Sequence, residues 1–390
     1  MVSGFFITAC LLWLLGSFVI PFALLKNIWS LPLLVHVNTV GLALFTMMGA
    51  LFQMLPVVAG AVIENPKRKA LISWSLLFGG YLPFLSGFFI KSLHLLLIGG
   101  FFLLTGVLYT SLLMLHRLIS IKSYTPTSKG MKFALLYLIL GAIVGFALLL
   151  SYWGFLPYRA VLLKVHLASM LFGWVFLLVA SVSFQVVEMF FVTKPYARNY
   201  AMNFPYFLTA ALFLSLWDSL YSRVPLALLV LFHAFLTLRR LMGRKRKTTD
   251  KLLHFWYLAF LNLTVSVPFY LLKDVDEVFF HYFLISFGLF FTTLIIGMML
   301  RIVSFLVWFH LSNEGAERVP LMSEVINQRM VSLCLYLTAL LSVSLYSLYF
   351  TKLYILPLSL YLMSAFTFSF CIIRGCMVYF RESPLYNPSV

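Results

Sequence analysis

Three histidines begin long apolar stretches of this sequence: His36, His166 and His281. Ionisable side chains are costly inside a bilayer, and those that occur there usually face the interior of a helix bundle. A neutral imidazole on such a face is a common axial ligand of haem iron, and two imidazoles from opposing helices form a six-coordinate electron-transfer centre. We therefore predict a haem site with His36 and His281 as ligands, His166 as a third inward candidate and His94 as an alternate. The remaining histidines lie toward the other ends of their stretches, where interfacial hydrogen bonding is expected: His116, His233, His254 and His310.

Polar side chains also occur near the far ends of the same stretches: Gln53, Gln185, Glu188 and Arg301. A lone charge there would be expensive, whereas a Glu–Arg pair with amide partners is tolerable. We therefore predict one buried polar cluster of these four residues. Its structural role would be to hold the helices together, and its functional role would be the inner end of a proton or ion path.

Such residues need a membrane-spanning scaffold, and the composition provides one. Of the 390 residues, 63% are hydrophobic and 10% are charged, which is too few charges to cover a soluble globule of this size. The apolar runs are continuous and helix-length, unlike the alternating pattern of outer-membrane barrels. The sequence thus predicts an all-α protein with one polytopic domain, residues 1–390, in a lipid bilayer.

The apolar runs number twelve, each near the roughly 20 residues of helix that cross a bilayer core. The predicted transmembrane helices span residues 5–25, 31–60, 70–90, 92–116, 133–155, 160–192, 205–221, 224–239, 253–272, 278–309, 330–350 and 353–380. Lys and Arg concentrate in the loops after the even-numbered helices, and cytoplasmic loops carry such an excess. We therefore predict a bacterial inner-membrane protein with both termini cytoplasmic.

The net charge of +17 is located mainly in these loops. Cationic loops lie favourably beside anionic lipid headgroups. No nucleic-acid recognition motif accompanies the charge, so nucleic acid is not expected as a partner. No nucleophile elbow, P-loop or zinc spacing is present either, and the four cysteines, none in a CxxC motif, are expected to be buried structural thiols.

The second, sixth and tenth predicted helices share one pattern. Its aligned positions are Gly41 with Gly173, Gly49 with Ser181 and Gly297, and Gln53 with Gln185 and Arg301. The three histidines stand 17, 19 and 20 residues before the last of these positions. The pattern predicts three pseudo-symmetric four-helix units, approximately residues 1–131, 132–250 and 251–390. Because small residues at such spacings also allow close helix packing, similarity among apolar helices is the alternative explanation.

The segment from His36-Val-Asn38 to Gly49-Ala-Leu-Phe-Gln-Met-Leu-Pro56 resembles the second helix of the catalytic subunit of nitric oxide reductases and haem-copper oxidases. This resemblance implies a b-type haem at His36 and a fold of twelve transmembrane helices like that of oxidase subunit I. The sixth and tenth helices look more like those of uncharacterised oxidase-like bacterial membrane proteins, and the NnrS proteins linked to nitric oxide tolerance are similar in size and helix count.

The chain departs from the oxidases where they complete their second metal site. Their histidine pair on helix 7 has no counterpart in residues 205–221, and their His-x-His on helix 10 is absent from residues 278–309. A complete binuclear centre is therefore not expected, and copper binding stays open.

These observations predict a haem-binding inner-membrane protein that acts in electron transfer, nitric oxide response or haem handling, with a cytochrome or another respiratory subunit as its partner. Whether it is an enzyme stays open. Two other classes are also open: a transporter of a small solute, metal or haem, for which a two-fold repeat of six helices would be evidence, and a non-catalytic subunit of a respiratory complex.

Overall fold

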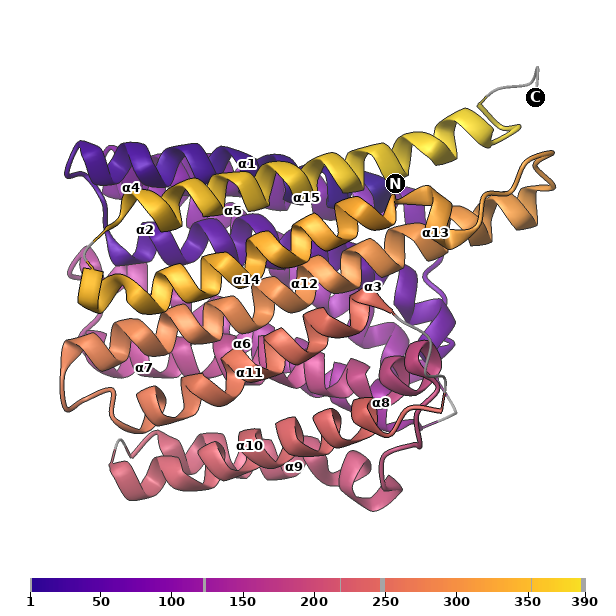
Figure 1. Ribbon diagram of the computed structural model, residues 1–390. Helices are drawn as coiled ribbons and strands as arrows, with labels where there is room; N and C mark the ends of the chain where they lie inside the picture. Colours follow the sequence, from indigo (N-terminus) through magenta and orange to yellow (C-terminus); the bar gives the residue numbers. More distant parts are fainter. Residues whose placement is uncertain (1, 122–123, 218, 246–249, 352, 387–390) are drawn as a thin grey trace.

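The computed structural model describes residues 2–121, 124–217, 219–245, 250–351 and 353–386. Within these ranges all regular structure is helical and there is no strand. The long helices lie side by side along one direction, and both ends of the chain lie at the same end of the bundle (Figure 1). We name this the terminal end. An all-α protein is confirmed.

The helices follow one another with short connections. In chain order they are α1 (Val2–Leu25), α2 (Leu31–His36), η1 (Val37–Leu44), α3 (Phe45–Ala59), α4 (Pro66–Phe89), α5 (Leu93–Ser120), α6 (Pro126–Tyr152), α7 (Arg159–Leu167), η2 (Ala168–Phe176), α8 (Leu177–Phe191), α9 (Arg198–Ser215), α10 (Leu220–Met242), α11 (Lys251–Leu271), α12 (Glu277–Glu314), α13 (Met322–Val325), α14 (Gln328–Thr351) and α15 (Ile355–Glu382). The elements α2, η1 and α3 form one continuous span, and so do α7, η2 and α8.

Eleven helices of the described chain are long and apolar enough to cross a membrane, which confirms a multi-pass membrane protein. They are the counterparts of eleven of the twelve predicted spans. The remaining prediction, residues 205–221, corresponds to α9, which runs from Arg198 to Ser215 and is not one of the eleven. Its first turns carry Arg198, Asn199 and Asn203, which lower its hydropathy. The capping box of Ser219 and Ser222 begins α10 at Leu220, earlier than predicted.

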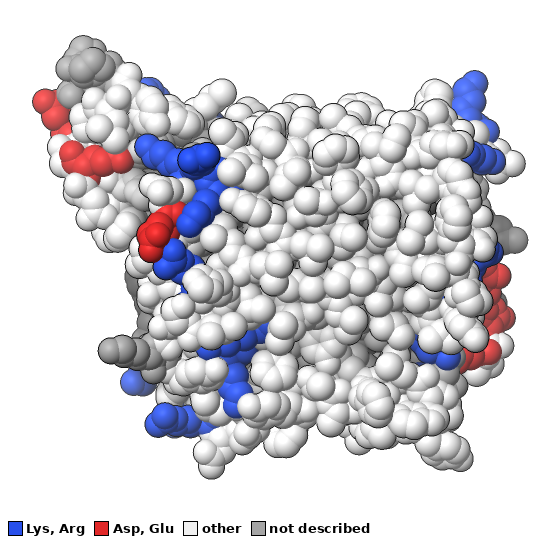
Figure 2. Space-filling view, turned by 180° about the vertical axis from the view of Figure 1, so that it is seen from behind, with Lys and Arg blue, Asp and Glu red and all other residues white. Residues whose placement is uncertain are grey.

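Charged side chains lie at the two ends of the bundle. Figure 2 shows a broad uncharged band between them, as a protein in contact with lipid acyl chains requires. All four cysteines are buried within the spans, as predicted.

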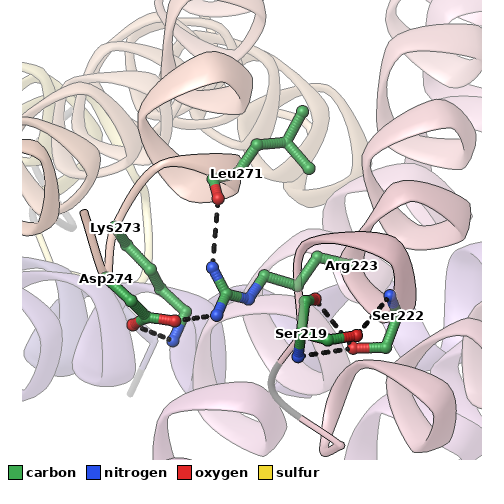
Figure 3. A network of polar contacts seen from close by, with 6 residues as sticks. All are labelled: Ser219, Ser222, Arg223, Leu271, Lys273 and Asp274. Carbon is green, nitrogen blue, oxygen red and sulfur yellow. Dashed lines mark hydrogen bonds and ion pairs between the residues drawn. The ribbon is translucent and has the colours of Figure 1, made fainter.

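A polar network at the end opposite the termini ties α10 to the loop between α11 and α12 (Figure 3). The Arg223 side chain is almost fully buried and donates to the Leu271 carbonyl oxygen at 3.0 Å. Arg223 also pairs with Asp274, whose other carboxylate oxygen lies 3.2 Å from the Lys273 ammonium. The guanidinium thereby satisfies a carbonyl group at the end of α11.

Two spans contain a π-helical segment, and both segments follow a histidine. In the first, η1 begins directly after His36 and contains Gly41; in the second, η2 begins two residues after His166 and contains Gly173. Short π-helical stretches inside α-helices occur frequently at functional sites. The third aligned span departs from this pattern, because α12 is α-helical from Glu277 to Glu314.

Close helix contacts hold these spans in place. The hydroxyl of Tyr81 on α4 occupies the space beside Gly41, where an added Cβ would lie only 2.6 Å from it. The rings of Phe172 in η2 and Phe287 in α12 are 5.3 Å apart, which joins the sixth predicted helix to the tenth. At the two ends of the sequence, α1 packs along α15 (Figure 1), and the Ser369 hydroxyl donates to the Cys10 carbonyl oxygen at 3.2 Å.

Candidate functional site

His36 and His166, which are 130 positions apart in the sequence, lie together in the fold. Their ring centres are 6.4 Å apart and their planes are inclined by 23°. Both side chains are partly buried. His36 is the last residue of α2 and His166 lies in α7, so the two spans that contain π-helical segments bring these imidazoles together.

Backbone carbonyl groups orient both imidazoles. The Nδ1 atom of His36 lies 2.7 Å from the Pro32 carbonyl oxygen, and the Nδ1 atom of His166 lies 2.8 Å from the Gly141 carbonyl oxygen. A carbonyl oxygen can only accept, so each Nδ1 carries the proton. In each neutral ring the Nε2 lone pair is then available for a metal. Histidines that bind metals typically have this arrangement, with the other ring nitrogen donating to a carbonyl or carboxylate group.

Local sequence signals place His36. Ser30 caps α2, its hydroxyl accepting from the Leu33 amide, and Pro32 occupies the first turn, where its missing amide proton costs nothing. Two residues after His36, the Asn38 side chain accepts from the Tyr361 hydroxyl at 2.8 Å. That hydroxyl accepts in turn from the Trp13 indole nitrogen at 2.8 Å. Side chains from α1 and α15 thus fix the start of η1.

Apolar groups and two glycines surround the pair. The His36 ring stands edge-on to Phe84 at 5.2 Å and nearly parallel to Phe88 at 5.6 Å. On the other side, the His166 ring lies against Gly145, where an added Cβ would be 2.8 Å from both Nδ1 and Cε1. Gly141 and Gly145 are four residues apart and share one face of α6. The missing side chains leave the space that the His166 ring fills.

The distance of 6.4 Å between the ring centres is close to that of two imidazoles bound to one metal ion. With metal–nitrogen bonds of about 2 Å, the two ring centres would be about 6 Å apart. Within the described residues, no group of three or more His, Cys, Asp or Glu side chains could hold a metal ion. A zinc site needs three or four protein ligands, whereas haem iron takes only its axial ligands from the protein. The donor set of His36 and His166 therefore fits haem better than a bare metal ion.

The other two candidate ligands lie elsewhere. His281 is near the start of α12, its side chain is 39% exposed, and its Nε2 is 3.8 Å from a carboxylate oxygen of Glu277. His94 is exposed at the start of α5, with its ring 4.7 Å from that of Trp153. The structure thus pairs His36 with His166 and not with His281. His281 instead lies one turn after Glu277 in the first turns of α12, with its imidazole toward that carboxylate.

A cavity of about 110 Å³ lies among the spans that share the repeated pattern. Ala50 of α3, Val182 of α8 and Met298 of α12 line it, and so do the residues three and four positions before each of them. These are equivalent positions in the sequence alignment. Three residues further along each helix come Gln53, Gln185 and Arg301, and all three are partly exposed. The structure therefore places three members of the predicted polar cluster at equivalent positions, one helical turn after Ala50, Val182 and Met298.

The expected ion pair between Arg301 and Glu188 is not found. The Arg301 guanidinium pairs with Asp250, while Glu188 is exposed near the end of α8. Asp250 is the N-cap of α11, and its other carboxylate oxygen accepts from the Leu252 amide at 3.0 Å. An acid at a helix N-terminus interacts favourably with the helix dipole. Sequence reasoning missed Asp250 because it stands next to a strongly basic loop.

A double-mutant cycle tests this pairing. Asp250→Asn keeps an acceptor for the Leu252 amide but removes the charge, so its coupling to Arg301→Gln isolates the ion pair. We expect a coupling free energy of unfolding of about 1 to 2 kcal/mol. The matched cycle of Glu188→Gln with Arg301→Gln should give no more than about 0.5 kcal/mol. Equal coupling in both cycles, measured by denaturant unfolding in detergent, would contradict the pairing seen in the structure.

Sequence reasoning also missed a buried cluster around His233, which was expected at the membrane interface. The structure buries this side chain completely. Its Nδ1 lies 3.2 Å from the Tyr200 hydroxyl, and its Nε2 lies 3.4 Å from the Ser183 hydroxyl. The Thr237 hydroxyl is 2.9 Å from that of Tyr196, and burial raises the pKa of Tyr196, so this group keeps its proton. The four-residue spacing of His233 and Thr237 on α10 was the available signal.

Comparison with known proteins identifies no relative: no family model matches the chain, and neither a curated protein nor a solved structure shows significant similarity to it.

Proposed function

We propose that this protein binds haem in a membrane, with His36 and His166 as the two axial ligands of the iron, and that it acts in electron transfer. The observation that carries this proposal is the pair of nearly parallel imidazoles, 6.4 Å apart, whose Nδ1 atoms both face backbone carbonyl oxygens. This arrangement leaves both Nε2 atoms free to coordinate.

Haem held by two histidines supplies a one-electron redox centre. If His36 and His166 both held the iron, the protein would leave no position on it for a substrate, which favours electron transfer over a reaction at the iron. Electron transfer is therefore preferred over a direct reaction with nitric oxide, and haem handling is the remaining role for such a site.

Residues of this chain would hold and tune the group. The Pro32 and Gly141 carbonyl oxygens keep the two Nδ1 protons in place, which fixes the ring orientations and makes each Nε2 a better donor. Phe84 and Phe88 pack against the His36 ring and cover part of it. Low exposure to water is one of the factors that set the potential of a haem centre.

The proposal includes an architecture of twelve transmembrane helices in three four-helix units, with α9 as the seventh, in a bacterial inner membrane with cytoplasmic termini. Two observations support this architecture. Residues at equivalent positions of α3, α8 and α12 line one cavity, and a π-helical segment follows both His36 and His166. The excess of Lys and Arg in the loops at the terminal end supports the orientation.

An absorption spectrum tests the proposal. Protein purified after expression with ample haem should show a Soret band typical of six-coordinate iron, and His36→Ala should abolish that six-coordinate spectrum. His281→Ala should leave it unchanged, which separates the pair seen in the structure from the pair expected from the sequence. Absence of any Soret band in the wild-type protein, together with metal analysis that finds no iron, would refute the proposal.

A further inference from the structure

We propose that the cavity among α3, α8 and α12 is a dry binding site for a small uncharged gas molecule of one or two heavy atoms. The site is separate from the histidine pair. Thr46, which lines the cavity, follows His36 by ten residues, a distance of about 15 Å along a helix. The proposal therefore does not depend on haem binding.

The apolar lining of the cavity favours an apolar ligand over water. Apolar atoms form the cavity surface, and no lining residue is ionisable. A buried water molecule needs two to four polar partners, and genuinely empty cavities in proteins are apolar. Water therefore has no favourable position in this cavity, whereas an apolar gas loses no hydrogen bonds when it leaves the bilayer or the solvent.

The size of the cavity narrows the choice further. Apolar cavities of about 150 Å³ accept benzene or xenon, and this cavity measures about 110 Å³. Its size is therefore closer to that of xenon or a diatomic molecule than to that of a six-membered ring. Five of the lining residues are methionines, whose unbranched side chains adapt to small differences in ligand shape.

The equivalent lining residues and the polar residues that follow them are not fully buried. Ala50, Val182 and Met298 keep some accessible surface although they face the interior of the bundle. The equivalent residues one turn further, Gln53 and Gln185 with Arg301, are also partly exposed. Accessible surface is thus present both at the cavity and one turn closer to the terminal end, where the side chains are polar.

Xenon is the probe for this site. Crystals of the full-length wild-type protein under xenon pressure should show one xenon atom among α3, α8 and α12. Ala50→Phe places a ring in the cavity and should weaken xenon binding there by about tenfold or more. The matched control is Val343→Phe, which adds the same ring to a side chain that is 67% exposed on α14, and it should leave xenon binding unchanged.

Three results would overturn the proposal: ordered water in the cavity, a lipid or detergent tail in it, or xenon binding that Ala50→Phe does not alter. If Ala50→Phe does not fold, Val182→Phe fills the same space from α8 and gives the same test. Neither variant touches the histidine pair, so a normal haem spectrum with lost xenon binding would show that the two sites are independent.

Discussion

Replacing His166 with glycine should remove the six-coordinate haem spectrum, and adding imidazole should restore it. The glycine leaves the space of the ring empty beside Gly145, so free imidazole can occupy that space and donate to the Gly141 carbonyl oxygen as His166 does. Loss of one hydrogen bond to a metal-binding histidine already costs about 10- to 100-fold in metal affinity, so loss of the histidine itself should cost at least about 100-fold. The measurement is a haem titration followed by absorption, with and without imidazole.

Gly145→Ala gives an independent form of this test because it keeps both histidines. The added Cβ would lie 2.8 Å from the His166 ring, so the ring must move and haem affinity should fall. Gly288→Ala in α12 is the matched control, since nothing lies within 4 Å of the added atom. If His166 only packs against its neighbours, imidazole will not change the His166→Gly spectrum and Gly145→Ala will bind haem normally.

Gly80→Ala should strongly destabilise the bundle, while Gly79→Ala should not. The Cβ of Gly80→Ala would lie 2.6 Å from the Leu103 amide nitrogen and 2.9 Å from the Gly99 carbonyl oxygen. These are backbone atoms, which cannot rotate away as a side chain does, so α4 and α5 must separate. Overpacking costs about 1 to 3 kcal/mol, and more where the neighbours cannot move. We therefore expect a loss of about 3 kcal/mol in the free energy of unfolding.

The neighbouring glycine is a matched control for this prediction. An added Cβ on Gly79 meets nothing within 4 Å, and alanine is favoured over glycine inside a helix by about 1 kcal/mol. Gly79→Ala should therefore leave stability unchanged or raise it. Denaturant unfolding in mixed micelles measures both variants. Similar stabilities of Gly80→Ala and Gly79→Ala would mean that α4 and α5 do not approach as closely as the structure shows. Gly80→Ala should also weaken haem binding, because α4 carries Phe84, which lies beside His36.

The positions of individual histidines show how far sequence patterns can reach. Glycines and glutamines at equivalent positions identified the two spans whose histidines lie together in the fold. Both histidines, His36 and His166, were among the residues expected to face inward. The sequence paired His36 with His281, whereas the structure places His166 beside His36. One turn of helix moves a side chain by about 5.4 Å, and the three histidines differ by up to three residues in register, so the sequence could not decide between the two partners. Such a shift leaves the hydrophobic pattern of a span almost unchanged, but it decides whether two imidazoles can reach the same metal ion.

Arg301 and His233 illustrate the same limit. An arginine within a membrane span needs an acidic partner, and the sequence analysis assigned Glu188 to Arg301. In the structure Arg301 pairs with Asp250, because the start of α11 lies beside α12 and holds the carboxylate in place. His233 was expected at the interface because it lies toward one end of its span; in the fold it faces α8 and α9 and is completely buried.

The sequence by itself determined the environment and the scaffold of this protein. A chain with 63% hydrophobic residues in helix-length runs must form helices in lipid, since each backbone polar group needs a partner within its own helix. Only the tertiary structure decided which imidazoles meet, which acid neutralises Arg301 and where an empty space remains. Those outcomes depend on helix register and on close packing within a few ångströms. Hydropathy is a property of a whole span, so it does not determine where a single side chain lies at that scale.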